Sequence, residues 1–396
     1  MSGPVHAAFL LQKIGPYHHA RLEAWAARAS GEVVAVEYRA GESVYAWDTV
    51  ASPGSYLRHQ TNSEQELIKL LGELRPRVVV CVGYADPEIS QAMAWAVGAG
   101  VPLVTCSDST QADETRSWAK ELLKRRVVSV FSAALVAGGR GSDYLASLGL
   151  EPSRHFRPWD VVDNAHFAAG AAASRHNEVD LRAILGLPAR YFLCVARFVP
   201  KKNLRRLIEG YADYARRAGD DAWSLVLSGS GPLESELRGA AAAAGRAARV
   251  HFPGFTQYPG LPALYGLAGA FVLPSSSDQW GLVVNEAMAA GLPVLVSARC
   301  SCAPDLVREG ENGFTFDPTD VDGLARRLAQ LAEMEPGQRA AIGQRSREIV
   351  ASYSPEAFAH GLEAAIACAT RHRRAQRSWL TRGLVRLLST RSVAPA

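Results

Sequence analysis

Short runs of apolar residues alternate along the chain with longer segments in which apolar residues recur at helical spacing. In the first half the strand-like runs fall at residues 5–11, 33–36, 78–82 and 102–106, and helical segments fall at 64–74 and 87–97. In the second half the strand-like runs fall at residues 191–196, 224–227, 271–273 and 293–296. Such alternation predicts an α/β protein whose parallel sheets are covered by helices on both faces.

The length of the chain and one small, polar stretch predict two domains. A chain of 396 residues is longer than one core usually organises. Residues 168–177 have the composition of a hinge. We therefore expect a first domain over residues 1–170 and a second over residues 188–352.

Composition is that of an ordinary globular protein, with 48% hydrophobic and 21% charged residues. The six cysteines are scattered and mostly lie in apolar runs, which favours reduced, buried thiols in a cytoplasmic protein. The N-terminus lacks the basic and apolar regions of a signal peptide. No apolar run reaches the roughly 18 residues that a membrane span needs.

Two basic segments stand out. Residues 116–126 predict a basic amphipathic helix, a pattern that usually marks a solvated face. The tail at residues 371–396 holds seven arginines and no acid, and without it the chain has 36 basic against 39 acidic residues. The tail is either a peripheral membrane anchor, with leucines and Trp379 on one side, or a frayed or packed helix. Nucleic acid is not an expected partner, because no recognised nucleic-acid-binding motif accompanies these basic residues.

The stretch at residues 271–297 carries the candidate chemistry and reads as strand, loop, helix and strand. Gly281 opens the helix, and the first-turn N–H groups of a helix have no partners within it. A helix start with a glycine that allows close approach suits a phosphate. Asp278 and Glu286, eight residues apart, suit a ligand with hydroxyls beside that phosphate. Nucleotide sugars have this layout.

The run Asp278-Gln279-Trp280-Gly281-Leu282-Val283-Val284-Asn285-Glu286-Ala287-Met288 resembles the signature of the retaining family-4 glycosyltransferases, also called glycosyl transferases group 1. That signature is Glu, seven residues and Glu, with aromatic-Gly-Leu between the two acids and Ala-Met after the second. The departure here is Asp278, which keeps the charge and shortens its reach by about one methylene.

The resemblance implies the GT-B fold, in which two Rossmann-like domains face a central cleft and a C-terminal helix, here residues 355–370, packs back on the first domain. It also implies retaining, metal-independent transfer of a sugar from a nucleotide-sugar donor, UDP-sugar favoured over GDP-sugar. The acceptor would be a hydroxyl of a glycan, a lipid-linked glycan or a small molecule. No cofactor beyond the donor is implied. From the cysteines and the basic tail we expect a cytoplasmic enzyme, or one associated with the cytoplasmic face of a membrane.

The resemblance also assigns roles to individual residues. Arg197 and Lys202 match the basic pair that holds the donor diphosphate, for which a bidentate Arg and a Lys point charge are suited. Glu286 would bind the ribose and Asp278 the transferred sugar, which completes a catalytic set of four. The further donor contacts are Gly15, Phe255, Gly281, Leu282 and Val283.

On the acceptor side the candidates are His18, in the loop after the first strand, and Asp108. Many relatives carry His-Asp where this chain has Ser107-Asp108, so the role of that histidine does not transfer. For both candidates a purely structural role, as a helix cap, stays open.

Two short runs resemble parts of metal-binding motifs, but the residues around them do not support a metal site. Cys300-Ser301-Cys302 has no second pair at matching spacing. Asp320-Val321-Asp322 precedes a helical segment and reads as a helix start. We therefore expect no metal site.

Three alternative functions stay open. The first is an enzyme of the same fold with other chemistry, a phosphorylase or a nucleotide-sugar epimerase. The second is a non-catalytic nucleotide-sugar-binding protein. The third is a nicotinamide enzyme, although Gly229-Ser230-Gly231 lacks the third glycine of a dinucleotide fingerprint, since Glu234 stands there.

Overall fold

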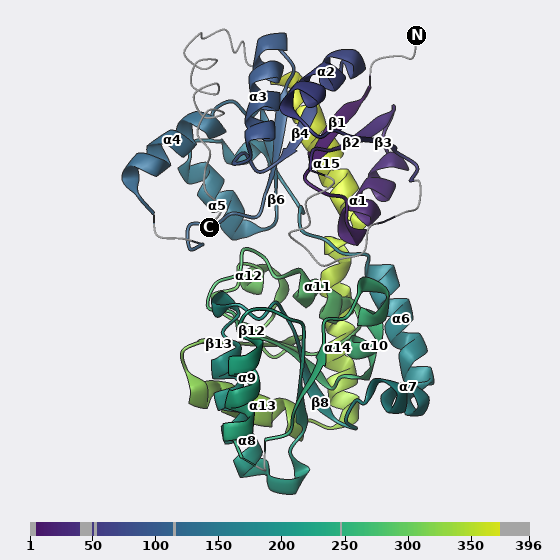
Figure 1. Cartoon of the computed structure of the whole chain (residues 1–396), viewed down its shortest axis with the longest axis vertical. Helices are drawn as coiled ribbons and strands as arrows, with labels where there is room; N and C mark the ends of the chain where they lie inside the picture. The colour runs from purple at the N-terminus through teal and green to yellow at the C-terminus, as the bar shows by residue number, and fades with distance from the viewer. Residues whose placement is uncertain (1–4, 40–49, 51–53, 114–115, 246–247, 373–396) are drawn as a thin grey trace. The chain divides into compact units, whose positions relative to one another are not determined.

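The computed structural model describes residues 5–39, 50, 54–113, 116–245 and 248–372. The described chain forms two compact units (Figure 1). The first runs to Val161 and resumes at Pro355, and the second runs from Val162 to Ser354.

The described part of the first unit holds a parallel seven-stranded sheet in the order β3-β2-β1-β4-β5-β6-β7. Its strands are β1 (Ala7–Leu11), β2 (Val33–Glu37), β3 (Leu57–Gln60), β4 (Val79–Val82), β5 (Leu103–Ser107), β6 (Ala133–Val136) and β7 (His155–Phe156). Its helices are α1 (Pro16–Ala26), α2 (Glu64–Leu74), α3 (Pro87–Ala99), α4 (Trp118–Val128), α5 (Gly139–Ser147) and α15 (Pro355–Arg371).

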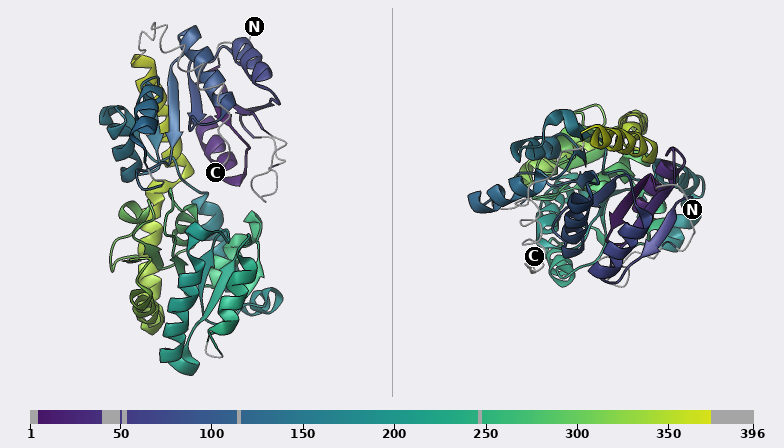
Figure 2. Two further views of the ribbon diagram at one scale, coloured as in Figure 1. Left: turned by 60° about the vertical axis from the view of Figure 1, so that its left-hand side comes forward. Right: turned by 90° about the horizontal axis from the view of Figure 1, so that it is seen from above.

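Alternate residues of β1 supply the two layers of this unit's core. Leu10 belongs to an aliphatic cluster with Leu67 of α2 and Met93 of α3. Phe9 points to the other face, where it meets Trp25 of α1 and Phe358 of α15. Figures 1 and 2 show α15, in yellow, beside α1 and along the sheet. The strands are apolar at successive positions because both of their faces are buried.

The described part of the second unit repeats the arrangement with a parallel six-stranded sheet in the order β10-β9-β8-β11-β12-β13. Its strands are β8 (Tyr191–Val195), β9 (Ser224–Ser228), β10 (Val250–Gly254), β11 (Ala270–Leu273), β12 (Val294–Ser297) and β13 (Gly313–Phe316). Its helices are α6 (Asn164–His176), α7 (Glu178–Leu185), α8 (Leu204–Ala218), α9 (Glu234–Ala243), α10 (Leu261–Leu267), α11 (Leu282–Ala289), α12 (Ala303–Leu306), α13 (Val321–Glu333) and α14 (Pro336–Val350).

Both sheets follow the doubly wound order, in which ligands bind at the carboxyl ends of the strands where the winding reverses. That switch point lies between β1 and β4 in the first unit and between β8 and β11 in the second. The predicted parallel α/β architecture is confirmed.

The predicted boundary at residue 170 and the hinge at 168–177 are wrong. The structure divides the chain between Val161 and Val162, and places the small residues inside α6. A Cβ on Gly170 would lie 2.5 Å from the ring of Pro262 in α10. Small residues therefore stand in α6 because α10 packs closely against it, and not because the chain is a flexible linker there.

Candidate functional site at the carboxyl ends of the strands

The loops after β8 and β9 pack backbone against backbone at the switch point of the second unit. The N–H of Phe198 donates to the carbonyl of Ser230 at 2.8 Å. Gly229 has φ 146°, and a Cβ there would lie 1.9 Å from the carbonyl oxygen of Ala196. This close approach accounts for the glycines that resembled part of a dinucleotide fingerprint, and it fixes the loop that carries Arg197.

The loop after β8 is also tied to the loop after β11. Asn203 adopts a left-handed conformation with φ 55°, and its amide donates to the carbonyls of Pro274 and Pro318 at 3.1 and 2.9 Å. The N–H of Ser276 donates to the carbonyl of Lys201 at 2.9 Å. These bonds hold together two loops that lie more than 70 residues apart in sequence.

The two loops bring Lys202 and Asp278 into direct contact. The Nζ of Lys202 lies 2.5 Å from Oδ2 of Asp278, and the two side chains are 13% and 10% exposed. The hydroxyl of Ser275 donates to the same Oδ2 at 3.1 Å. Within the described residues no hydrogen bond reaches Oδ1 of Asp278. The carboxylate is thus held through one oxygen while the other has no hydrogen-bond partner in this part of the chain.

The backbone of Asp278 is fixed as well. Its carbonyl accepts from the N–H of Ser301 at 2.9 Å, and it forms a parallel bridge with Cys300. The side chain therefore stands on a rigid edge of the sheet. Since Cys300 and Cys302 are fully buried, the pair that resembled half a metal site packs in the core beneath this edge.

Gly281 starts α11 in a conformation that other residues rarely adopt. Its φ is 98°, and a Cβ there would lie 2.9 Å from Cδ2 of Leu273. In the described part of the chain no acceptor meets the N–H groups of Leu282 and Val283. These three residues stand at the helix start as the sequence predicts, beside the Lys202–Asp278 pair, since Asp278 lies within 3.8 Å of the Gly281 Cβ position.

Glu286, the expected ribose ligand, does not lie on an exposed surface. It is fully buried, and its Oε2 accepts from the hydroxyl of Tyr265 on α10 at 2.6 Å. Tyr265 also packs edge-on against Phe167 of α6, which contacts Tyr258 in turn. Burial raises the pKa of Tyr258 well above its usual range, with Asp163 and Glu286 adding to the effect.

Sequence reasoning did not single out Tyr265, which lies in the largely apolar segment that forms α10. A tyrosine within such a helix was the available signal, since a buried hydroxyl requires a hydrogen-bond partner.

Arg197 and Phe255 are both exposed at strand ends. Arg197 stands two residues after β8, and Phe255, 40% exposed, follows β10 directly. A partly exposed aromatic side chain at the carboxyl edge of a sheet can stack on a planar ligand.

In the first unit, Gly15 and His18 lie at the switch point, at the start of α1. The ring Nδ1 of His18 accepts from the N–H of Gly15 at 3.4 Å. Burial, reinforced by the charge of Arg21, lowers the pKa of His18 to about 3, so the imidazole is neutral at neutral pH. Because Nδ1 accepts, the proton of the neutral ring is on Nε2.

Two residues that the sequence did not point to hold this loop. Burial alone would raise the pKa of Glu37, but hydrogen bonds from Arg58, Gln60 and the N–H of Ile14 bring it below its ordinary value. The Glu37 carboxylate thereby fixes the residue that precedes Gly15.

Arg21 is the second such residue, a buried cation on α1. Its guanidinium donates to the carbonyl of Val161 at 2.8 and 3.2 Å and lies 4.4 Å from the ring centroid of Trp159. Asp108, the other acceptor-side candidate, follows β5 and contributes electrostatically to the same guanidinium. The two predicted acceptor-side residues, His18 and Asp108, thus share Arg21 as a neighbour.

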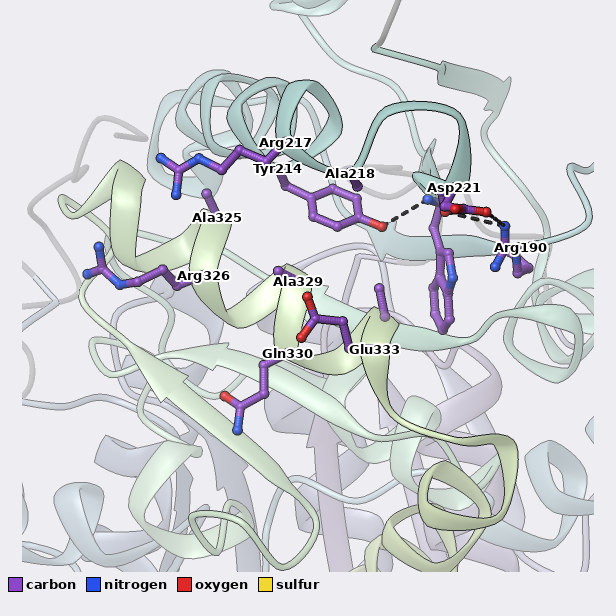
Figure 3. Close-up of a pocket in the computed structure, with 12 residues that line it drawn as sticks. Arg190, Tyr214, Arg217, Ala218, Asp221, Ala325, Arg326, Ala329, Gln330 and Glu333 are labelled. Carbon is purple, nitrogen blue, oxygen red and sulfur yellow. Dashed lines mark hydrogen bonds and ion pairs between the residues drawn. The ribbon is translucent and has the colours of Figure 1, made fainter.

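The structure also contains a pocket away from these residues (Figure 3). It lies between α8 and α13, at the amino end of β8, and Arg190, Arg217, Asp221 and Glu333 are among its lining residues. None of the residues predicted from the sequence lines it. Its cations and acids are mixed, and Arg190 lies 3.8 Å from Asp221. We assign the candidate site to the carboxyl ends of the strands.

Comparison with known proteins agrees with this placement. Residues 181–349 match the family model described as Glycosyl transferases group 1. These residues form a group 1 glycosyltransferase domain. The resemblance of the 278–288 run to that family is therefore confirmed.

The chain is similar to several curated glycosyltransferases over part of its length. It is 33% identical over 162 residues to a GDP-mannose-dependent α-(1-6)-phosphatidylinositol monomannoside mannosyltransferase of Mycolicibacterium smegmatis, across 39% of this chain and 41% of that one. The protein of the same name in Mycobacterium tuberculosis is 29% identical over 240 residues, across 59% of this chain and 60% of that one. The matches thus span about half the length of these relatives.

Among solved structures, Anabaena HepE in complex with UDP superposes with a TM-score of 0.71 over 91% of this chain and 99% of that one, at 16% identity. This likeness shows the fold. The chain has the GT-B fold, with one parallel α/β sheet in each unit.

Among the described residues no helix is long and apolar enough to cross a membrane, and no group of three or more metal-ligating side chains is found.

Proposed function

We propose that the protein transfers a sugar from a nucleoside-diphosphate sugar to a hydroxyl acceptor, with retention at the anomeric carbon and without a metal ion. The observation that supports this most is the Lys202–Asp278 pair beside the open start of α11. In this pair a single hydrogen bond connects a cation suited to a diphosphate with a carboxylate suited to a sugar hydroxyl. That combination matches the two halves of a nucleotide sugar.

The same residues supply a mechanism. Negative charge develops on the leaving diphosphate, and fixed cations and helix-start N–H groups lower the barrier most when they are already in place. Lys202, Arg197 and the N–H groups of Leu282 and Val283 would fill this role. Oδ1 of Asp278 would accept a hydrogen bond from a sugar hydroxyl. The resemblance implies that the departing phosphate takes the acceptor proton, so no protein base is assigned.

For the donor, we propose GDP-mannose in place of the UDP-sugar that the sequence alone favoured. Both curated relatives described above are named GDP-mannose-dependent mannosyltransferases, which conflicts with a preference for UDP. The UDP of the HepE complex belongs to a protein only 16% identical. The acceptor proposed is a hydroxyl of a glycan or lipid-linked glycan, as those relatives' names also favour.

The test is a donor screen followed by product analysis. We expect GDP-mannose and GDP to raise the melting temperature more than UDP-glucose and UDP do, since a ligand at 100 times its Kd adds about 2.7 kcal/mol to the free energy of unfolding. Transfer to an acceptor panel should give the α-anomer by NMR and proceed in EDTA. Phosphate-dependent release of sugar phosphate would identify a phosphorylase instead, and donor binding without turnover would identify a binding protein.

Gly15→Ala separates a ligand-contact role from a structural one. The backbone of Gly15 has φ −96°, and no atom lies within 4 Å of an added Cβ, so the fold accepts alanine there. We expect the free energy of unfolding to change by less than about 1 kcal/mol, because the weaker helix cap and the stiffer unfolded chain oppose each other. Transfer should nevertheless fall at least about 10-fold, if the donor phosphates approach this backbone. Normal kinetics would remove Gly15 from the donor site.

Tyr265→Phe tests the buried bond to Glu286. Removing the hydroxyl leaves a buried carboxylate without that donor, which should cost about 1–3 kcal/mol in urea unfolding. Glu286→Gln alone should weaken GDP binding, as expected of a ribose ligand. The double variant Tyr265→Phe/Glu286→Gln should be more stable than the sum of the single losses, because no charge is then left unpaired. Strictly additive losses with unchanged GDP binding would make Glu286 neither a ribose ligand nor a partner of Tyr265.

A further inference from the structure

Helix α4 leaves two large apolar side chains in solvent. Trp118 is 82% exposed and Leu122 is 52% exposed, and the two are four residues apart, so they lie on one face of the helix. The helix lies at the outer edge of the first unit, beside α5 (Figure 1). None of the residues assigned to the donor or acceptor site lies on it.

Two exposed arginines lie on the same side of the helix. Arg125 and Arg126 are exposed and follow Trp118 by seven and eight residues, which places them beside it along the helix. The one acid in the sequence of α4, Glu121, lies three residues after Trp118, at the border of this face, and its carboxylate accepts from the hydroxyl of Tyr144 in α5 at 3.1 Å. It also lies 3.4 Å from Lys124.

We infer that this face of α4 is a docking surface for a membrane that carries anionic lipids. Tryptophan and leucine on one side of a basic helix enter the boundary between headgroups and acyl chains, while the arginines contact lipid phosphates. This inference rests on α4 alone and does not depend on the proposed transfer reaction.

The size and charge of the face favour a lipid surface over a protein partner. A helix of 11 residues is about 17 Å long, and one side of it falls well short of the roughly 800 Å² that each partner buries in a stable protein complex. A bilayer needs no complementary shape and offers phosphates along the whole helix.

Helix α7 provides a contrasting surface within the same chain. It also exposes two large apolar side chains, Val179 (82%) and Ile184 (75%), but these are five residues apart and do not share one face, and its first turn carries Glu178 and Asp180. Acidic side chains repel an anionic membrane. We therefore assign the membrane to α4 and not to α7, and α7 serves as the matched control.

The experiment is co-sedimentation of the full chain with lipid vesicles. Vesicles of phosphatidylcholine with one third phosphatidylglycerol are compared with pure phosphatidylcholine, at low and high NaCl. We expect binding to the anionic vesicles only, weakened at high salt. The variants Trp118→Ser/Leu122→Ser and Arg125→Gln/Arg126→Gln should each bind at least about 10-fold more weakly, with unchanged melting temperatures. Val179→Ser/Ile184→Ser should bind like the unaltered chain.

A further variant separates α4 from the basic tail. Arg373→Gln/Arg374→Gln/Arg377→Gln lowers the tail's charge, and vesicle binding should fall less than in either α4 variant. The inference is overturned if this tail variant loses binding while both α4 variants keep it. It is also overturned by equal binding to neutral vesicles, by equal losses in the α7 control, or by concentration-dependent self-association that the α4 variants abolish.

Discussion

Lys202→Ala should lower transfer at least about 100-fold in a protein that stays folded, with a lower melting temperature because Asp278 is left without its cation. A fixed positive charge at a developing oxyanion contributes roughly 3 kcal/mol to the transition state, which corresponds to about two orders of magnitude in rate. The variant also removes the cation that lies 2.5 Å from Asp278, so the sugar-side carboxylate loses its strongest partner. Loss of charge on one side chain therefore acts on both halves of the donor site.

Lys201→Ala is the matched control for this prediction. Lys201 is the preceding residue and is exposed, and the described bonds to it use its backbone carbonyl, which alanine retains. Its removal changes the net charge equally and should leave transfer within about two-fold. Arg197→Ala should resemble Lys202→Ala, because both cations would face the diphosphate. Equal rates for Lys201→Ala and Lys202→Ala, with both proteins folded, would remove Lys202 from the diphosphate site.

Local patterns predicted the elements of the second unit well. The interpretation of residues 271–297 as strand, loop, helix and strand is confirmed by β11, α11 and β12. The reason is that each signal is local: an apolar run, a short helix that begins after Gly281, and a second glycine with positive φ, Gly291, that follows the end of the helix. Gly281 in particular takes a φ of 98°, which residues with a side chain rarely adopt, so glycine is strongly favoured where the helix starts.

Contacts between distant segments were not predictable in the same way. Nothing in the sequence indicates that Lys202 and Asp278, 76 residues apart, share a hydrogen bond. The contact depends on Asn203, whose left-handed backbone and two amide bonds join the loops. The pair formed by Tyr265 and Glu286 is similar, because it joins side chains of two different helices, α10 and α11.

The wrong hinge shows how one composition can arise from two causes. Small residues at 168–177 resemble a linker, and they also allow helices to approach closely. In this chain Gly266 of α10 stands where a Cβ would lie 2.8 Å from Ala171, so the close packing of α6 and α10 is the cause. Only the partner helix distinguishes the two interpretations, and that helix lies far along the chain.

The second large effect is predicted at Asp278, where this chain departs from the family signature. Asp278→Asn should lower transfer about 10- to 100-fold, since a lost hydrogen bond from a charged partner costs on the order of 1.5–3 kcal/mol. Its Oδ2 is held by Lys202 and Ser275, so the oxygen that would meet the sugar is Oδ1. Ser275→Ala, which removes only one of the two restraints, should lower transfer less than Asp278→Asn does.

Asp278→Glu should change donor choice more than folding. The longer side chain places its carboxylate about one methylene farther from the backbone, so it should bond a different sugar hydroxyl, and its 2.5 Å contact to Lys202 has to rearrange. Rates with GDP-mannose and its epimer GDP-glucose measure this directly, and their ratio should shift at least about five-fold. GDP alone should bind the aspartate, asparagine and glutamate forms without loss. In the asparagine form the neutral amide no longer forms an ion pair with Lys202, so the lysine can contact the diphosphate. If GDP loses affinity as much as the full donor does, then Asp278 acts on the phosphates or on the loop, and the shorter carboxylate does not set the sugar specificity.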